Sequence, residues 1–224
     1  MIKLGTSDMT KAYVGTTEVS KIYLGSELVY SAAPAPLPYD AQVEYLQSTG
    51  TQYINTGITP DSATGFTAMV HSSNSTDSYL IGLRNNNSNT RWGFGHVNTG
   101  YYYMYNVAGG TSDRLNEDPA TLYLNYLNDK KAKIVGTNTK TINLPTLSFT
   151  PSYNIRLFGS AGVSASYTVW SGKIYYVKIS QGSSVIMDLI PVRVGTVGYM
   201  YDKIGGNLLS NSGSGSFTLG NDIV

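Results

Sequence analysis

The sequence predicts an all-β protein in which a small N-terminal repeat precedes a two-sheet antiparallel sandwich. Charged residues make up only 13% of the chain, whereas there are 24 Gly and 19 Tyr. The polarity therefore comes largely from Ser, Thr, Asn and Tyr, which favour strands and turns. The first thirty residues repeat every ten, and short strand-like segments separated by turn residues recur after residue 38. No segment combines a 3.6-residue apolar period with helix caps.

Residues 1–30 are an internal repeat of three decads: MIKLGTSDMT, KAYVGTTEVS and KIYLGSELVY. The glycines in register precede renewed apolar alternation, so we expect a small β-meander. Chains shorter than roughly 40 residues seldom bury a sufficient core alone, and the segment therefore needs a protein partner. We expect it to oligomerise or to anchor the chain, and the alternative is a solubilising cap on the main domain. The side chains available for such contacts include Lys11, Tyr13, Lys21 and Tyr23.

Residues 31–38, SAAPAPLP, form a Pro/Ala-rich linker. Three prolines and three alanines in eight positions predict an extended, semi-stiff spacer. The main domain is accordingly expected at residues 39–224.

Two strands of the main domain are predicted in detail. In SGKIYYVKIS, strict alternation places Tyr175 and Val177 on one face and Tyr176 on the other. In SVIMDLIPVR, the apolar run suggests a central strand that ends at Pro191, because proline lacks a backbone donor.

Several phrases of the main domain resemble the laminin-G-like or concanavalin-A-like jelly rolls of gut phages and gut bacteria. They are VEYLQSTGTQYINTG at 43–57, LFGS at 157–160, WSGKIYY at 170–176, DLIPV at 188–192, GYMYDK at 198–203 and the turn-rich NSGSGSFTLG. The resemblance covers most of residues 43–221 and implies a lectin-like jelly-roll sandwich. It does not specify a ligand.

The Lys-x-Tyr-x-Gly-Ser/Thr decads resemble short repeats at the head of tailed-phage virion proteins. That resemblance implies a virion surface protein, either a head fibre, a tail fibre or a decoration subunit. Its expected partners are other virion proteins, through residues 1–30, and two further copies of itself in a trimer. A cell-surface glycan is the expected ligand of the sandwich. The alternatives are a carbohydrate-binding module of a bacterial surface protein and, least favoured, a glycoside hydrolase.

The residues do not suggest an enzyme. A retaining glycosidase needs two carboxylates about 5–5.5 Å apart, and no predicted strand carries such a pair. The adjacent Glu117 and Asp118 precede Pro119 and suggest a solvated loop. His71 and His96 lack the nucleophile elbow of a serine hydrolase and the spacing of a metal site. We therefore expect no catalytic residue, no metal and no cofactor.

The strongest binding candidate is the most aromatic stretch, between residues 85 and 105. Sugars stack on Trp or Tyr rings and accept hydrogen bonds from polar side chains. The predicted glycan surface consists of Arg91, Trp92, His96 and Tyr102. The competing interpretation is that these residues belong to the core, because about half of the residues in an alternating strand face inward. Trp170, by contrast, is expected in the core.

Charge and targeting signals narrow the partners and the location. The net charge of +1 and the scattered Lys and Arg argue against nucleic acid as a partner. No apolar run reaches the roughly 20 residues that span a bilayer, and no export signal is recognisable at Met1. The absence of Cys suits a chain made in a reducing cytoplasm. The expected location is the virion surface, after synthesis in the host cytoplasm.

Overall fold

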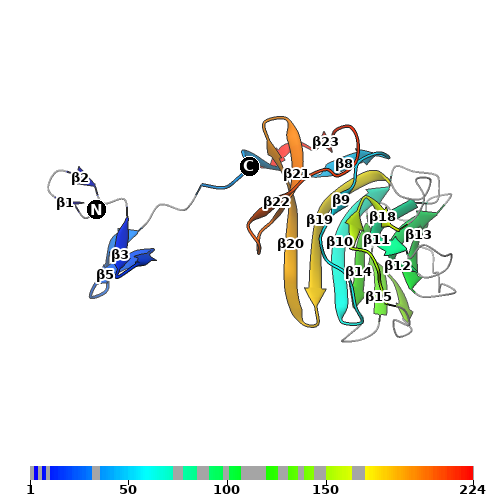
Figure 1. The fold of residues 1–224 in the computed structure, drawn as a ribbon, viewed down its shortest axis with the longest axis horizontal. Helices are drawn as coiled ribbons and strands as arrows, with labels where there is room; N and C mark the ends of the chain where they lie inside the picture. Colours follow the sequence, from blue (N-terminus) through cyan, green and yellow to red (C-terminus); the bar gives the residue numbers. More distant parts are fainter. Residues whose placement is uncertain are drawn as a thin grey trace. The chain divides into compact units, whose positions relative to one another are not determined.

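The computed structural model divides the chain into two compact units, residues 1–37 and residues 38–224. It describes residues 3–4, 7–8, 11–31, 36–72, 78–84, 91–97, 101–106, 120–125, 131–135, 139–143, 150–162 and 170–223. The described residues form strands and no helix, and so contain no helix able to cross a membrane. The predicted all-β class is therefore confirmed (Figure 1).

The N-terminal unit contains one strand pair for each decad. The pairs are β1 (Lys3–Leu4) with β2 (Ser7–Asp8), β3 (Ala12–Val14) with β4 (Thr17–Val19), and β5 (Lys21–Leu24) with β6 (Glu27–Ser31). Gly15 and Gly25 have φ of 63° and 66°, as the first position of a two-residue hairpin turn requires. The three pairs form separate two-stranded sheets. The expected single meander is thus replaced by a series of hairpins, because each decad folds back on itself.

A large antiparallel sheet forms one layer of the main unit. Its path runs β16 (Thr139–Asn143), β15 (Lys131–Val135), β14 (Ala120–Asn125), β10 (Thr64–Ser72), β19 (Ser171–Gln181), β20 (Ser184–Val194), β21 (Val197–Asp202) and β22 (Asn207–Leu209). Strands from the two ends of the unit join it: β7 (Ala41–Val43), β8 (Leu46–Thr49), β23 (Thr218–Leu219) and β24 (Asp222–Ile223). Because β7 pairs with β20 and β8 with β19, the beginning of the domain is paired with its last long strands.

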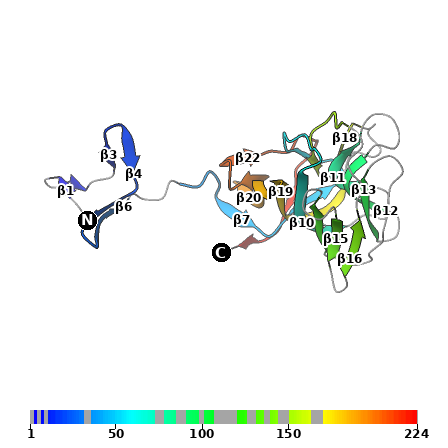
Figure 2. The ribbon, with the colours of Figure 1, turned by 90° about the horizontal axis from the view of Figure 1, so that it is seen from below.

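The second layer is a four-stranded sheet, seen beside the large sheet in Figure 2. Its order is β13 (Tyr101–Asn106), β12 (Arg91–Val97), β11 (Ser78–Arg84) and β18 (Gly159–Ala161). A short pair, β9 (Ile54–Asn55) with β17 (Arg156–Leu157), completes the domain. The two layers meet through aromatic side chains: Phe66 of β10 lies 5.3 Å from Phe94 of β12, ring centre to ring centre. The core is thus that of a β-sandwich.

Trp170 lies in this core, as predicted. It is fully buried, and its ring stacks on Phe158 with 6.0 Å between centroids. Phe158 is also fully buried and is the one described non-glycine residue with positive φ, at 60°. Its N–H donates to the carbonyl of Leu80, and its carbonyl accepts from Trp170, which fixes this unusual conformation between the layers.

The predicted end of a strand at Pro191 is wrong. β20 continues to Val194, and Pro191 is paired with Met200 of β21. On the opposite edge of β20, pairing with β19 reaches Leu189 and pairing with β7 begins at Val192. Pro191 lies at this change of partner, so its missing N–H interrupts no ladder.

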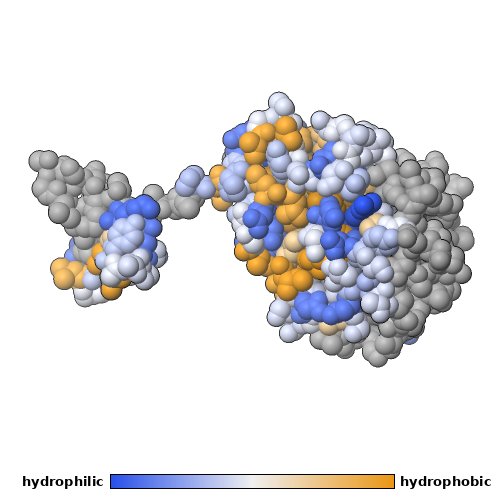
Figure 3. All heavy atoms as spheres, viewed as in Figure 1, coloured by the Kyte–Doolittle hydropathy of each residue, from blue (hydrophilic) through white to orange (hydrophobic). Residues whose placement is uncertain are grey.

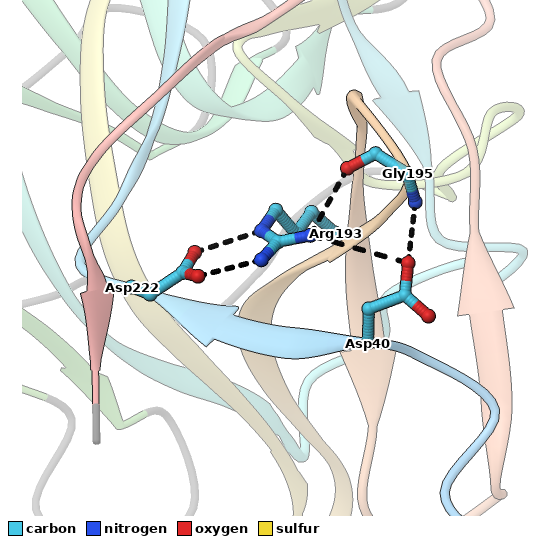
Figure 4. Close-up of polar contacts among 4 residues, drawn as sticks. All are labelled: Asp40, Arg193, Gly195 and Asp222. Atoms are coloured by element: carbon cyan, nitrogen blue, oxygen red, sulfur yellow. Dashed lines mark hydrogen bonds and ion pairs between the residues drawn. The ribbon is translucent and has the colours of Figure 1, made fainter.

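A polar cluster ties the two ends of the domain to β20 (Figure 4). Arg193 donates to both carboxylate oxygens of Asp222, from Nε at 2.8 Å and from the second guanidinium nitrogen at 2.6 Å. Asp40, just before β7, accepts from the N–H of Gly195 at 2.6 Å. The hydrogen bond from Arg193 holds the pKa of Asp222 below its usual value, and the same contact raises the pKa of Arg193.

Candidate functional site

The four residues of the predicted glycan surface lie on β12 and β13. The register sets Arg91 opposite Arg84 of β11, and His96 opposite Tyr102 of β13. The side chains of Arg91, His96 and Tyr102 lie outside the described part of the structure. The prediction for these three residues therefore remains a prediction.

Trp92 does not belong to a binding surface. Its side chain is fully buried, and its ring lies 5.6 Å from that of Phe66 in an edge-to-face contact. The alternation in Arg91-Trp92-Gly93-Phe94-Gly95 explains why: the two large rings share one face of β12, and glycines occupy the other. The competing interpretation, that Trp92 belongs to the core, is correct. The alternation of large aromatic residues with glycines in the sequence already indicated which face of the strand is buried.

Partly exposed tyrosines instead occur on the outer face of the large sheet. In β10, β19, β20 and β21, buried residues alternate with partly exposed ones, as expected for a sheet with one face on the core. The outward positions include an apolar and aromatic row across four neighbouring strands, which we call the tyrosine row. Its members are Met69, Tyr176, Ile190 and Tyr201.

Strand register holds the tyrosine row together. Met69 is paired with Tyr176, and Ile190 with Tyr201. Val177 of β19 is paired with Leu189 of β20. Tyr176 and Ile190 each lie one residue beyond this antiparallel pair, so they lie opposite each other. Tyr201 also contacts the ring of Tyr39 at 5.0 Å. With neighbouring strands about 4.8 Å apart, Tyr176 and Tyr201 are separated by roughly 10 Å, comparable with the length of a disaccharide.

A charged row runs beside the tyrosine row and is called here the lysine row: Lys178, Asp188 and Lys203. Lys178 and Asp188 are a register pair of β19 and β20, two positions along from Tyr176 and Ile190. The Asp188 carboxylate oxygen Oδ2 lies 3.4 Å from Nζ of Lys178 and 3.1 Å from Nζ of Lys203. Both lysine side chains are about half exposed, at 48% and 47%, so their remaining N–H donors face solvent.

The turn after β21 fixes the position of Lys203. Asp202 points to the core side and is 5% exposed. Its carboxylate accepts from the N–H of Asp188, Ile204 and Gly205 at 3.0, 3.1 and 3.0 Å. The N–H of Lys203 in turn donates to the carbonyl of Asp188 at 2.8 Å. Asp188 and Asp202 therefore hold the turn and the lysine row, and lie on opposite faces of the sheet.

A second aromatic cluster lies where β8 meets β19. Nζ of Lys173 lies 4.1 Å from the centre of the Tyr45 ring, and the Tyr45 and Tyr175 rings meet edge to face at 5.7 Å. All three side chains are partly exposed. The ammonium group already occupies one face of the Tyr45 ring, so that face is not open to a ligand.

Strict alternation along β19 mispredicted the faces of this strand. Val177 and Ile179 are buried, whereas Tyr175, which was expected to share their face, is partly exposed. The register between β10 and β19 shifts between Met69 and Val70, so that Tyr175 is the extra residue of a β-bulge. The tyrosine row was also missed, although the alternation Tyr176-Val177-Lys178 contains its signal.

The described residues show no group of three or more His, Asp or Glu placed to hold a metal ion. Glu117 and Asp118, the acidic pair considered from the sequence, lie outside the described residues.

Comparison with known proteins identifies the fold only. No family model matches the sequence, and no curated protein matches it. One similar solved structure is a Bacteroides ovatus protein described as a "putative carbohydrate binding protein". The alignment has a TM-score of 0.51 and 13% identity, and it covers 87% of this chain but 63% of the other. The chain thus spans less than two thirds of that protein and shares with it an all-β sandwich architecture.

Proposed function

We propose that residues 38–224 form a carbohydrate-binding domain of the lectin kind. The proposal rests mainly on the tyrosine row, which lies on the outer face of the large sheet. The sandwich that carries it also resembles a protein described as carbohydrate-binding. Tyrosine rings offer an apolar face for a sugar ring and a hydroxyl for its polar groups. Fold alone would be a weak argument, since sandwiches of this kind serve many functions.

Binding without catalysis is the proposed activity. Among the described carboxylates, Asp188 is engaged by two lysines and Asp202 by three backbone N–H groups. Since the two residues lie on opposite faces of the sheet, they do not form an acid/base pair across one sugar bond.

A screen of the full chain against immobilised polysaccharides tests the proposal. We expect retention by at least one polymer, and no release of reducing sugars from it. A full screen of plant, bacterial and mucosal polysaccharides without retention would overturn carbohydrate binding, and sugar release would overturn the non-catalytic role.

We further propose that the N-terminal unit attaches the domain to a larger assembly, with a virion fibre or decoration protein as the favoured context. Large apolar side chains recur exposed at equivalent positions of the decads. Tyr13 and Tyr23 are 55% and 54% exposed, and Val14 and Leu24 are 72% and 75% exposed. Figure 3 shows a few hydrophobic residues, in orange, at the surface of this unit among hydrophilic ones. Two-stranded hairpins are marginally stable alone, so a partner covering these side chains would stabilise them.

Light scattering tests this attachment role with the full 24.2-kDa chain. If the unit joins copies of the chain, the wild type has the mass of a trimer. Combined Tyr13→Ser and Tyr23→Ser substitutions then yield monomers, whereas Tyr45→Ser, in the other unit, does not. A trimer that survives the double substitution would contradict self-assembly through these hairpins.

A further inference from the structure

We propose that the tyrosine row and the lysine row together bind an extended acidic polysaccharide, a uronic-acid polymer being the simplest example. This inference rests on the proposed carbohydrate-binding function and adds the face and the chemical class of the ligand. It places binding on the outer face of the large sheet, away from the four-stranded sheet that carries Arg91, His96 and Tyr102.

The shape of this face favours a chain rather than a single sugar. Met69, Tyr176, Ile190 and Tyr201 lie on successive strands, so a ligand following the row crosses the strands. The two tyrosines stand about two strand spacings apart, roughly 10 Å. Alternate sugar rings of a chain can therefore stack on Tyr176 and Tyr201, with Ile190 between them. The Tyr39 ring, packed on Tyr201, extends the aromatic surface beyond the row.

The charge of the lysine row selects the class of polysaccharide. Two half-exposed ammonium groups share one outward carboxylate, that of Asp188. The nearby Asp202 carboxylate is buried and accepts from three backbone N–H groups. Asp188 positions both lysines, and its side chain is only 15% exposed. Because residues two apart on a strand are about 6.6–7 Å apart, a carboxylate on a sugar stacked at Tyr176 can reach Nζ of Lys178. A neutral sugar would offer that ammonium group no charged partner in addition to Asp188.

Affinity electrophoresis of the full chain measures this directly, with polygalacturonate and its fully methyl-esterified form as the two polymers. The esterified polymer keeps the backbone and lacks the charge. We expect wild-type protein to be retarded by polygalacturonate about tenfold more strongly than by the ester. The difference should shrink as salt rises from 50 to 500 mM, because exposed charges are screened.

Matched substitutions locate the site. Tyr176→Leu keeps an apolar side chain and removes the ring, and it should weaken polygalacturonate binding about tenfold. Tyr45→Leu makes the same change off the row and should not. Lys178→Gln should abolish most of the preference for the acidic polymer, whereas Lys21→Gln, with the same change in net charge in the other unit, should leave it intact. Melting temperatures establish that each variant is folded.

Each outcome decides a different claim. If the chain binds polysaccharide but Tyr176→Leu and Lys178→Gln bind as wild type, this face is not the site, and the carbohydrate-binding proposal stands. Equal retardation by the two polymers, weakened by Tyr176→Leu, overturns only the acidic class. No retardation by any polysaccharide in the wider screen overturns the proposed function itself.

Discussion

At the scale of single residues, glycine decides how closely two strands of the small sheet approach. Gly82 and Gly93 face each other across β11 and β12, with φ of 156° and 118°. A Cβ atom at Gly93 would lie 2.0 Å from the carbonyl oxygen of Ile81. Since that neighbour is backbone, it cannot move aside without disturbing the ladder. The pair therefore helps to set the position of Trp92 and Phe94 in the core.

We expect Gly93→Ala to lower the free energy of unfolding by more than about 1 kcal/mol. Gly57→Ala is the matched control, because Gly57 also has positive φ, 76°, but has open space around its Cβ position. Urea denaturation of both variants gives the comparison. Equal losses would show that backbone strain, and not the close approach of the strands, accounts for the effect.

The buried Trp92 gives a second expectation at this scale. Trp92→Ala should cost about 3–5 kcal/mol, as for other large side chains deleted from a core. Its removal should affect polysaccharide binding only through stability. If the variant stayed folded but lost polysaccharide binding, Trp92 would belong to the binding site after all.

At the scale of elements, strand identity could be predicted from the sequence, but strand partners could not. Alternation located β19 and β20 and placed Val177 and Ile179 on the same face, which is buried in the structure. The bulge that turns Tyr175 outward depends on the register with β10, which is far away in sequence. The change of partner at Pro191 likewise depends on β7. Both features depend on which two segments pair, so they cannot be predicted from the sequence of one strand.

The hydrogen bonds between Arg193 of β20 and Asp222 of β24 predict that the stability of the fold depends on pH. The pKa of Asp222 is lowered in the folded state, so this carboxylate stabilises the fold above its unfolded pKa, near 3.8. That contribution is lost as the pH falls through the lower, folded pKa. We expect Asp222→Asn to lower the melting temperature at pH 7 and to differ little from wild type near pH 2. If the variant's melting temperature were lower than that of wild type by the same amount at both pH values, Arg193 would stabilise the fold independently of the charge on Asp222.

At the scale of the whole molecule, the two units suggest a division of labour. The hairpins expose apolar side chains at equivalent positions, and the sandwich buries a continuous core beneath a tyrosine-bearing face. The repeat and the fold class could be predicted because period and alternation are local properties. The proposed binding face could not be predicted, because Tyr176, Ile190 and Tyr201 become neighbours only when β19, β20 and β21 pair. The aromatic stretch around Trp92 was predicted as a site because its residues are neighbours in the chain.

Isothermal titration of the full chain with a soluble fragment of a retained polysaccharide tests the central claim most directly. The account predicts saturable binding with one site per chain and a negative heat-capacity change, since stacking on tyrosine rings buries apolar surface. The absence of saturable heat with the fragment of every retained polymer would contradict a carbohydrate-binding domain.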